Sequence, residues 1–186
     1  RFETILPELV SELHDLRHPI GETCTLKGEV AQRMWHACYP FRHTYITPMA
    51  AVAGAVAQAL LPAYQRAGIR RAWINNGGDI ALHLAPDASV RVGLYANLAH
   101  LDTQQLQEGL RLDGSFDIHH NSTVRGVATS GWRGRSFSLG IADSVTVLAG
   151  TAAQADAAAS IIGNAVNVDA EGIKRVPACV LKDDSD

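Results

Sequence analysis

The sequence predicts one domain of the α+β class, in which mixed sheets pack against alanine-rich helices. Three observations support this: helical spacing of apolar residues before residue 65, alternating apolar and polar residues between 70 and 148, and an alanine-rich helical segment after that. A length of 186 residues favours a single domain, 1–186. Because each alanine-rich segment adjoins β-rich sequence, two related α+β halves within this domain are an alternative organisation.

Three helices are expected in the first third of the chain. Apolar residues at helical spacing predict an amphipathic helix over 5–16 that covers a core edge, through Leu6, Leu9, Val10, Leu13 and Leu16. A second short helix is expected over 28–40, ending near Pro40. Thr47 and Pro48 form a suitable N-cap and first-turn pair, so a third helix is expected from there to about Tyr64.

The middle of the chain is expected to be β-rich, because apolar and polar residues alternate there. Strands are predicted over 70–76, 79–85, 89–95, 123–128, 136–139 and 144–148. The last helix is expected to begin at Thr151, where Gln154 completes a Thr-x-x-Gln capping box, and to end near Gly163 or Asn164.

Composition limits the classes of function. Apolar residues make up 47% and charged residues 19%, as in a soluble globular protein. The net charge is −3 and basic runs are short, so no nucleic-acid partner is expected. No apolar run reaches the roughly 18 residues of a membrane span, and three scattered cysteines favour a reducing cytoplasm. Because the chain starts at Arg1, a preceding leader stays an open possibility. A homo-oligomer is also left open.

The last helix carries a candidate metal site. Asp156 and Ser160 stand four residues apart, so their oxygens emerge on one face. A carboxylate and a hydroxyl suit a hard cation such as Mg²⁺. The alternative is a solvated aspartate and a serine bonded to its own helix. The many alanines around the pair would allow either close ligand approach or tight packing of the helix on a sheet.

Two glycine-containing turns and one helix start are candidate ligand sites. In "NNGGD", Asn75 to Asp79, the glycines permit positive φ or close ligand approach, and Asp79 could bind ribose hydroxyls or an amide-bearing ring. "TSGW", from Thr129, offers hydroxyl and backbone donors to a phosphate. The helix start at Thr47 could receive an anion. Ordinary turns and an ordinary helix start are the alternatives, and the histidines are expected to be solvated or core side chains.

Taken together, "ITPMAAVAGAVAQAL", "NNGGDIAL", "VATSGW" and "ADSVTVLAGTAAQADAAASIIGNAV" resemble the ApbE-type superfamily of FAD:protein FMN transferases, especially its small, mostly uncharacterised cytoplasmic branch. The resemblance covers roughly Tyr45 to Val166. It implies an ApbE-like α+β fold related to tunnelling folds, with the flavin diphosphate held between its halves.

The resemblance also implies site residues. In family transferases a helix aspartate and a hydroxyl residue four positions later ligate Mg²⁺, and these positions match Asp156 and Ser160, with serine in place of the more usual threonine. The candidate residues for binding FAD are Thr47, Met49, Asn76, Gly77, Gly78, Asp79, Thr129, Ser130 and Gly131.

The implied reaction is attack by a Ser or Thr hydroxyl of an acceptor protein on the FMN phosphorus of FAD, with AMP leaving. After Thr-Ser-Gly, transferases usually carry a histidine and an Asp-Pro stretch, whereas this chain reads "WRGRSFSLGIADS". Asp143 is the nearby carboxylate, and Arg133 or Arg135 could clamp phosphate. Asp143 and Arg135 are therefore the candidate catalytic residues.

Two alternatives to the transferase stay open. One is a carrier or sensor that binds a flavin or a nucleotide without chemistry. The other is an enzyme that acts on a different flat heterocycle, such as a pterin-like ring, because a fold does not fix a function.

Overall fold

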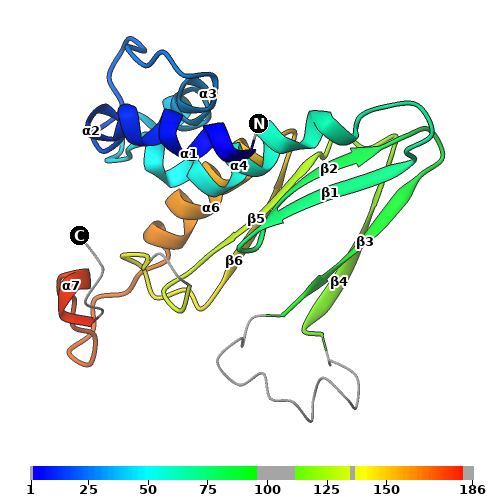
Figure 1. The fold of residues 1–186 in the computed structure, drawn as a ribbon. Helices are drawn as coiled ribbons and strands as arrows, with labels where there is room; N and C mark the ends of the chain where they lie inside the picture. The colour runs from blue at the N-terminus through cyan, green and yellow to red at the C-terminus, as the bar shows by residue number, and fades with distance from the viewer. Residues whose placement is uncertain (1, 96–111, 135–136, 182–186) are drawn as a thin grey trace.

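The protein is of the α+β class and contains two antiparallel sheets (Figure 1). The structure is a computed structural model that describes residues 2–95, 112–134 and 137–181. A four-stranded sheet has the order β1-β2-β5-β6, formed by β1 (Arg71–Asn76), β2 (Asp79–Leu84), β5 (Gly126–Ser130) and β6 (Val145–Ala149). A two-stranded sheet pairs β3 (Ser89–Leu94) with β4 (Gly114–His119).

A two-residue turn joins β1 to β2 and fixes their register. Asn76 pairs with Asp79, and the intervening Gly77 and Gly78 have φ of +70° and +114°. Positive φ is the conformation that favours glycine, and it explains why the sequence has two glycines here. The Gly78 N–H donates to Oδ1 of Asn75 over 2.9 Å, which closes the turn.

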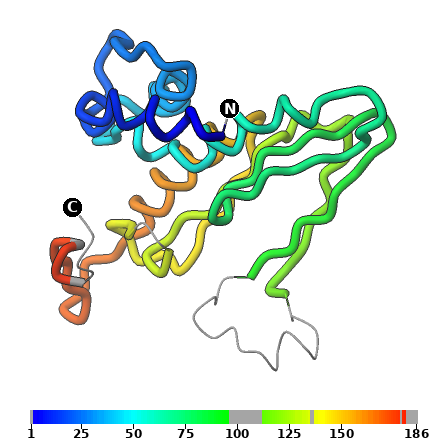
Figure 2. Tube along the Cα trace, in the orientation of Figure 1, coloured from blue at the N-terminus to red at the C-terminus, as the bar shows by residue number. Residues whose placement is uncertain are grey.

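Helices cover one face of the four-stranded sheet (Figure 1). The helical elements are α1 (Phe2–Ser11), α2 (Leu13–Leu16), α3 (Glu29–Cys38), η1 (Tyr39–Phe41), η2 (Pro48–Ala51), α4 (Val52–Leu60), η3 (Leu61–Tyr64), α6 (Ala152–Ala165) and α7 (Ala178–Leu181). The chain path in Figure 2 brings α3, near the N-terminus, against α6, which follows the last strand. Both α4 and α6 contact the sheet, so they lie between it and the N-terminal helices.

Small side chains allow α4, α6 and the sheet to approach closely. Five alanines of α6 are at most 1% exposed: Ala152, Ala153, Ala155, Ala157 and Ala159. A Cβ on Gly54 of α4 would lie 2.3 Å from the Ala152 carbonyl oxygen, so a glycine is needed there. These contacts support tight packing as the reason for the alanines. The opposite sheet face packs larger residues of β2 and β5 against β3 and β4.

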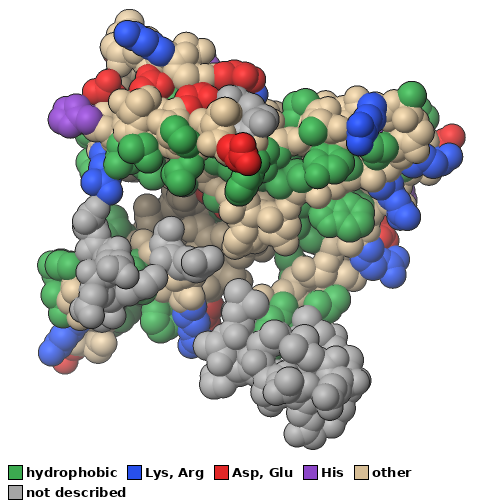
Figure 3. Space-filling view, viewed as in Figure 1, with side chains coloured by type: hydrophobic (Ala, Val, Ile, Leu, Met, Phe, Trp, Pro, Cys, Tyr) green, Lys and Arg blue, Asp and Glu red, His purple; other side chains and the backbone are tan. Residues whose placement is uncertain are grey.

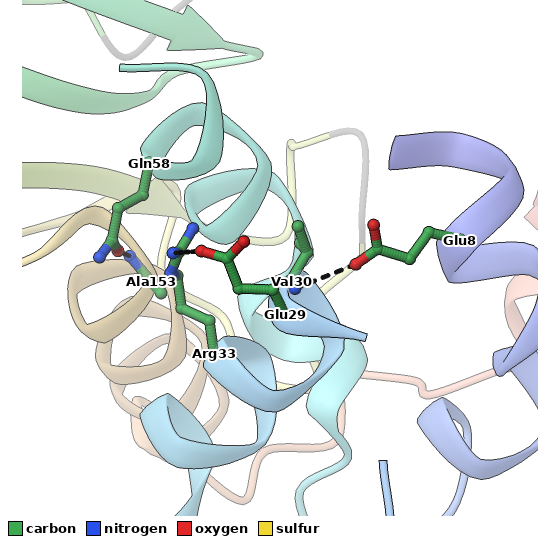
Figure 4. Close-up of polar contacts among 6 residues, drawn as sticks. All are labelled: Glu8, Glu29, Val30, Arg33, Gln58 and Ala153. Carbon is green, nitrogen blue, oxygen red and sulfur yellow. Dashed lines mark hydrogen bonds and ion pairs between the residues drawn. The ribbon is translucent and has the colours of Figure 1, made fainter. Parts of the chain in front are cut away.

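Side chains from neighbouring helices cap the starts of α3 and α6 (Figure 4). Glu8 of α1 accepts a hydrogen bond from the Val30 N–H (3.3 Å), and Gln58 of α4 accepts one from the Ala153 N–H (3.4 Å). Within α6, Thr151 Oγ1 accepts from the Gln154 N–H over 3.3 Å, which confirms the predicted N-cap. The helices are thus joined by polar contacts as well as by their cores.

Most predicted strands are present, whereas two of the predicted helices are divided. The helix expected over 5–16 is split into α1 and α2, and the helix expected from Thr47 to about Tyr64 is α4 flanked by the 3-10 helices η2 and η3. Further details of the expectation are also wrong. β4 is an additional strand, and β5 begins at Gly126 and runs on to Ser130. Residues 137–139 form no strand, because the Leu139 N–H donates to Asn164 and this segment joins the end of α6 instead. Leu6 and Val10 are 69% and 57% exposed, since only one side of α1 faces the core.

Two further findings concern the chain as a whole. Among the residues that the structure describes, no helix has the length and apolar character needed to cross a membrane. Cys24, Cys38 and Cys179 are all free thiols.

Candidate functional site

Asp79 begins β2, immediately after the glycine turn, and its side chain faces the helical layer. Asp79 is 8% exposed, and its Oδ1 accepts a hydrogen bond from the Thr129 N–H on β5 over 3.2 Å. Burial raises the pKa of the Asp79 carboxyl to about 6, although the Thr129 hydrogen bond acts in the opposite direction. The adjacent strands β2 and β5 therefore hold a carboxyl group whose charge is costly.

Asp156 lies in α6 and points at the start of α4. Its Oδ2 accepts a hydrogen bond from the Gly54 N–H over 2.9 Å. The pKa of Asp156 is raised to about 7, chiefly by burial and also by the charge on Asp79, while backbone hydrogen bonds from Gly54 and Ala53 oppose the shift. The effect of the Asp79 charge on Asp156 means that the two carboxylates are neighbours, although they are far apart in the sequence.

Three candidate residues converge on the segment that joins η2 to α4. Ser160 Oγ donates to the Ala50 carbonyl oxygen over 3.4 Å, and Asn76 Nδ2 donates to the Ala53 carbonyl oxygen over 3.2 Å. Asp156 contacts the same segment through Gly54. The structure thus brings Asn76, Asp79, Asp156 and Ser160 together around one helix start, as a single polar cluster.

The expected cap at this helix start is absent. Thr47 occupies the N-cap position with extended backbone, but its side chain makes no capping hydrogen bond. Thr47 therefore has the expected N-cap position, followed by Pro48, but it begins the 3-10 helix η2 and provides no side-chain cap. The N-cap residue of α4 is Ala51, and Asp156 of α6 accepts from the Gly54 N–H in the first turn of that helix. Met49 is partly buried and packs against the helical core.

The Thr-Ser-Gly segment lies at the end of β5, and the backbone and side chain of Thr129 contact different neighbours. The Thr129 N–H reaches Asp79, whereas its hydroxyl lies 2.9 Å from the Thr146 hydroxyl in an exposed pair. Ser130 lies beside the end of α6, because its Oγ is 3.6 Å from where a Cβ on Gly163 would stand. A Cβ on Gly131 would lie 2.3 Å from the Asp143 carbonyl oxygen. The tight backbone contact therefore explains this glycine.

Asp143 is engaged by residues of its own loop. Its Oδ1 accepts from Trp132 Nε1 over 2.9 Å and lies 3.0 Å from Nε of Arg133, and its side chain is 61% exposed. Arg135, the other candidate catalytic residue, lies outside the described residues. The structure thus links Asp143 to the residues that follow the Thr-Ser-Gly turn, Trp132 and Arg133.

The chemistry of the polar cluster fits a hard divalent cation. Asp79 is a buried carboxylate and Asp156 a partly buried one, and the charge on Asp79 disfavours the charge on Asp156. Ser160 adds a hydroxyl oxygen one turn from Asp156. Among the described residues, no Lys or Arg forms an ion pair with either carboxylate. A cation bound by oxygen ligands would supply the missing positive charge.

Sequence reasoning missed two residues of this cluster. The Gly54 N–H donates a hydrogen bond to Asp156. The Cys38 thiol lies near Asp156, and burial together with the charge on Asp156 raises the pKa of this thiol to about 12. Gly54 stands in the run "AVAGAVA". The sequence shows that this residue has no side chain, but it does not show that its backbone contacts Asp156. Cys38 carried no signal, because it lies alone in a helix on the other side of the cluster.

Comparison with known proteins gives the relationship. The family described as AbpE bacteria matches residues 1–186. The UPF0280 protein of Methanothrix thermoacetophila is 39% identical over 142 residues, covering 76% of this chain and 54% of that protein. The UPF0280 protein of Methanopyrus kandleri is 39% identical over 148 residues, covering 78% of this chain and 53% of that protein.

The chain spans about half the length of the curated relatives that it matches. A third relative, the UPF0280 protein of Methanothermobacter thermautotrophicus, shows 41% identity over 128 residues, which cover 68% of this chain and 45% of that protein. Because the family match extends over the whole of the sequence, this chain belongs to the AbpE bacteria family.

Proposed function

We propose that this chain binds FAD with Mg²⁺ held at Asp156 and Ser160, and transfers FMN to a Ser or Thr hydroxyl of an acceptor protein. The observation that carries the proposal is the buried Asp79 carboxylate beside the partly buried Asp156 carboxylate, with no paired Lys or Arg among the described residues. Membership of the AbpE bacteria family and the resemblance to FAD:protein FMN transferases support the choice of ligand.

The residues of the cluster have separable roles in this proposal. Asp156 and Ser160 would hold the metal, which when bound would neutralise charge on the FAD diphosphate. Asp79 would bind hydroxyl or amide groups of the ligand, and its hydrogen bond from Thr129 holds it at the end of the glycine turn. A Cβ at Gly77 or Gly78 would meet no atom within 4 Å, so this turn leaves room for a flat ligand.

In the proposed reaction, the acceptor hydroxyl oxygen forms a bond to the phosphorus of the FMN half. The bond from that phosphorus to the bridging oxygen breaks, and AMP leaves with that oxygen. The hydroxyl proton passes to a base.

A second candidate function is binding without transfer. It is favoured by the state of Asp143, the carboxylate nearest to the Thr-Ser-Gly turn in sequence, which is already paired with Trp132 and Arg133.

The test is a titration of FAD into the protein, with Mg²⁺ or with EDTA, followed by flavin fluorescence and by an assay for released AMP. Asp156→Asn and Ser160→Ala should lose the Mg²⁺-dependent part of binding, whereas Asp117→Asn, which removes an exposed carboxylate paired with Arg91, should keep it. Mg²⁺-dependent binding with AMP release on addition of a Ser- or Thr-containing acceptor peptide supports transfer. Binding without AMP supports the second candidate, and no binding overturns both.

A further inference from the structure

A second group of metal-binding side chains lies on the opposite side of the helical layer from the sheet. His14 is in the short helix α2, Asp15 follows it, and His18 comes directly after the C-cap residue of that helix. All three residues are exposed. Figure 3 shows acidic and histidine side chains together on the surface over α1 and α2. The cluster shares no residue with the Asp79–Asp156 cluster.

The geometry brings three ligand atoms close together. One ligand atom from each of His14, Asp15 and His18 lies within 4.8 Å of the other two. The two imidazole rings have centroids 4.5 Å apart, with their planes inclined by 59°. Histidines four positions apart face the same way at the end of a helical turn, so one ion could contact both rings.

A hydrogen bond prepares His18 for this role. Its Nδ1 lies 2.7 Å from the carbonyl oxygen of His14. A carbonyl only accepts, so Nδ1 carries the proton, and the lone pair of neutral His18 is then on Nε2. Metal-binding histidines commonly donate their other ring N–H to a carbonyl in this way, which fixes the tautomer and the ring orientation.

Nearby carboxylates favour a cation. Asp15 lines a surface hollow together with Glu8 of α1 and Glu12, the N-cap residue of α2, and Lys27 from the segment before α3 lies at the same hollow. Glu12 is held by the amides of Lys27 and Gly28 at 2.6 and 2.7 Å. The acidic side chains therefore stay near Asp15 and make its surroundings negative.

We propose that His14, Asp15 and His18 form a site for a borderline divalent cation of the Zn²⁺ type. Two imidazole nitrogens and one carboxylate suit Zn²⁺ and its neighbours in the first transition row, whereas Mg²⁺ prefers oxygen ligands alone. Three protein ligands leave a coordination position for water or for a group of another molecule. The bound ion would connect His14 to His18 and so hold the chain in one conformation where it leaves α2.

This proposal departs from the expectation that the histidines are solvated or core side chains, which rested on the view that the sequence has no His-x-x-x-His spacing. The sequence carries the signal, because "HDLRH" places His14 and His18 at a spacing of i and i+4. Asp15 adds the third ligand from the same segment.

The experiment is a zinc titration of the protein by calorimetry, with a parallel Co²⁺ titration followed by visible absorption. His14→Gln and His18→Gln should each weaken zinc binding by at least about tenfold, because losing even an outer-shell partner costs roughly 10–100-fold. His43→Gln is the matched control, since His43 is also exposed and should leave the affinity unchanged. Circular dichroism checks that every variant is folded.

Two further variants distinguish this site from other sources of zinc binding. Asp156→Asn should lose Mg²⁺-dependent FAD binding and keep zinc binding, so a failure of the proposed function can be told apart from a failure of the zinc proposal. Cys179→Ser should keep zinc binding, because the exposed Cys179 thiol is not among the proposed ligands. Unchanged zinc affinity in both His14→Gln and His18→Gln, or an equal loss in His43→Gln, overturns the proposal.

Discussion

Replacing Asp156 by Asn should make the stability of the metal-free protein less sensitive to a rise in pH from 5 to 8. The pKa of Asp156 is about 7 in the folded protein against an ordinary value of 3.8, so the folded state holds the neutral carboxyl better than the charged one. Its contribution to stability is complete below pH 4, roughly, and is lost as the pH rises through about 7. Asn keeps an oxygen that can accept from the Gly54 N–H and carries no charge.

The magnitude follows from the shift. Between pH 5 and the folded pKa near 7 there are about two pH units, and each corresponds to about 1.36 kcal/mol, so wild type should lose roughly 2–3 kcal/mol of unfolding free energy that the variant keeps. Urea denaturation in EDTA at pH 5 and pH 8 measures this difference. Asp143→Asn is the control, because that carboxylate is mostly exposed and ion-paired. Equal pH dependence in wild type and Asp156→Asn would refute the argument that Asp156 is buried at a charge cost.

Two further predictions concern packing and capping. Gly54→Ala places a Cβ 2.3 Å from the Ala152 carbonyl oxygen, and we expect a net loss of about 1–2 kcal/mol, since strain of about 1–3 kcal/mol exceeds the helix-propensity gain of up to about 1. Gly21→Ala, where a Cβ meets nothing within 4 Å, is the control, and equal stability of the two variants in urea denaturation would contradict the clash. Glu12→Ala removes the acceptor of two backbone N–H groups at the start of α3 and should cost about 1–2 kcal/mol, with Glu12→Gln losing less. An unchanged denaturation midpoint for Glu12→Ala would mean that water replaces this cap without cost.

The sequence predicted the elements whose signals are local. Thr151 and Gln154 marked the start of α6, and two consecutive glycines marked the turn between β1 and β2. β4 was missed because its apolar residues, Phe116 and Ile118, alternate with charged and polar ones over only six residues, and its pairing with β3 is not visible along the chain. The same limit explains why Leu6 and Val10 of α1 are exposed: apolar periodicity predicts a helix, but it does not show how many of its apolar residues reach the core.

The candidate site was only partly predictable for the same reason. Asp79, Thr129 and Asp156 were singled out from separate motifs, and in the structure Asp79 is a neighbour of both other residues. What the motifs could not give is the role of Gly54, because the contact that defines it depends on how α4 crosses α6. The raised pKa values are also a property of the assembled structure, since burial and a neighbouring charge cause them.

The distance along the chain between Asp156 and Gly54 has a consequence for how the protein is made. The two residues are 102 positions apart, so a growing chain has the start of α4 long before the carboxylate that accepts its amide. Closing so long a loop is entropically costly, and it places α6 docking after the earlier elements have formed. The capacity to bind a cation at Asp156 would then arise last in folding, and a bound ion would favour only chains that have completed it.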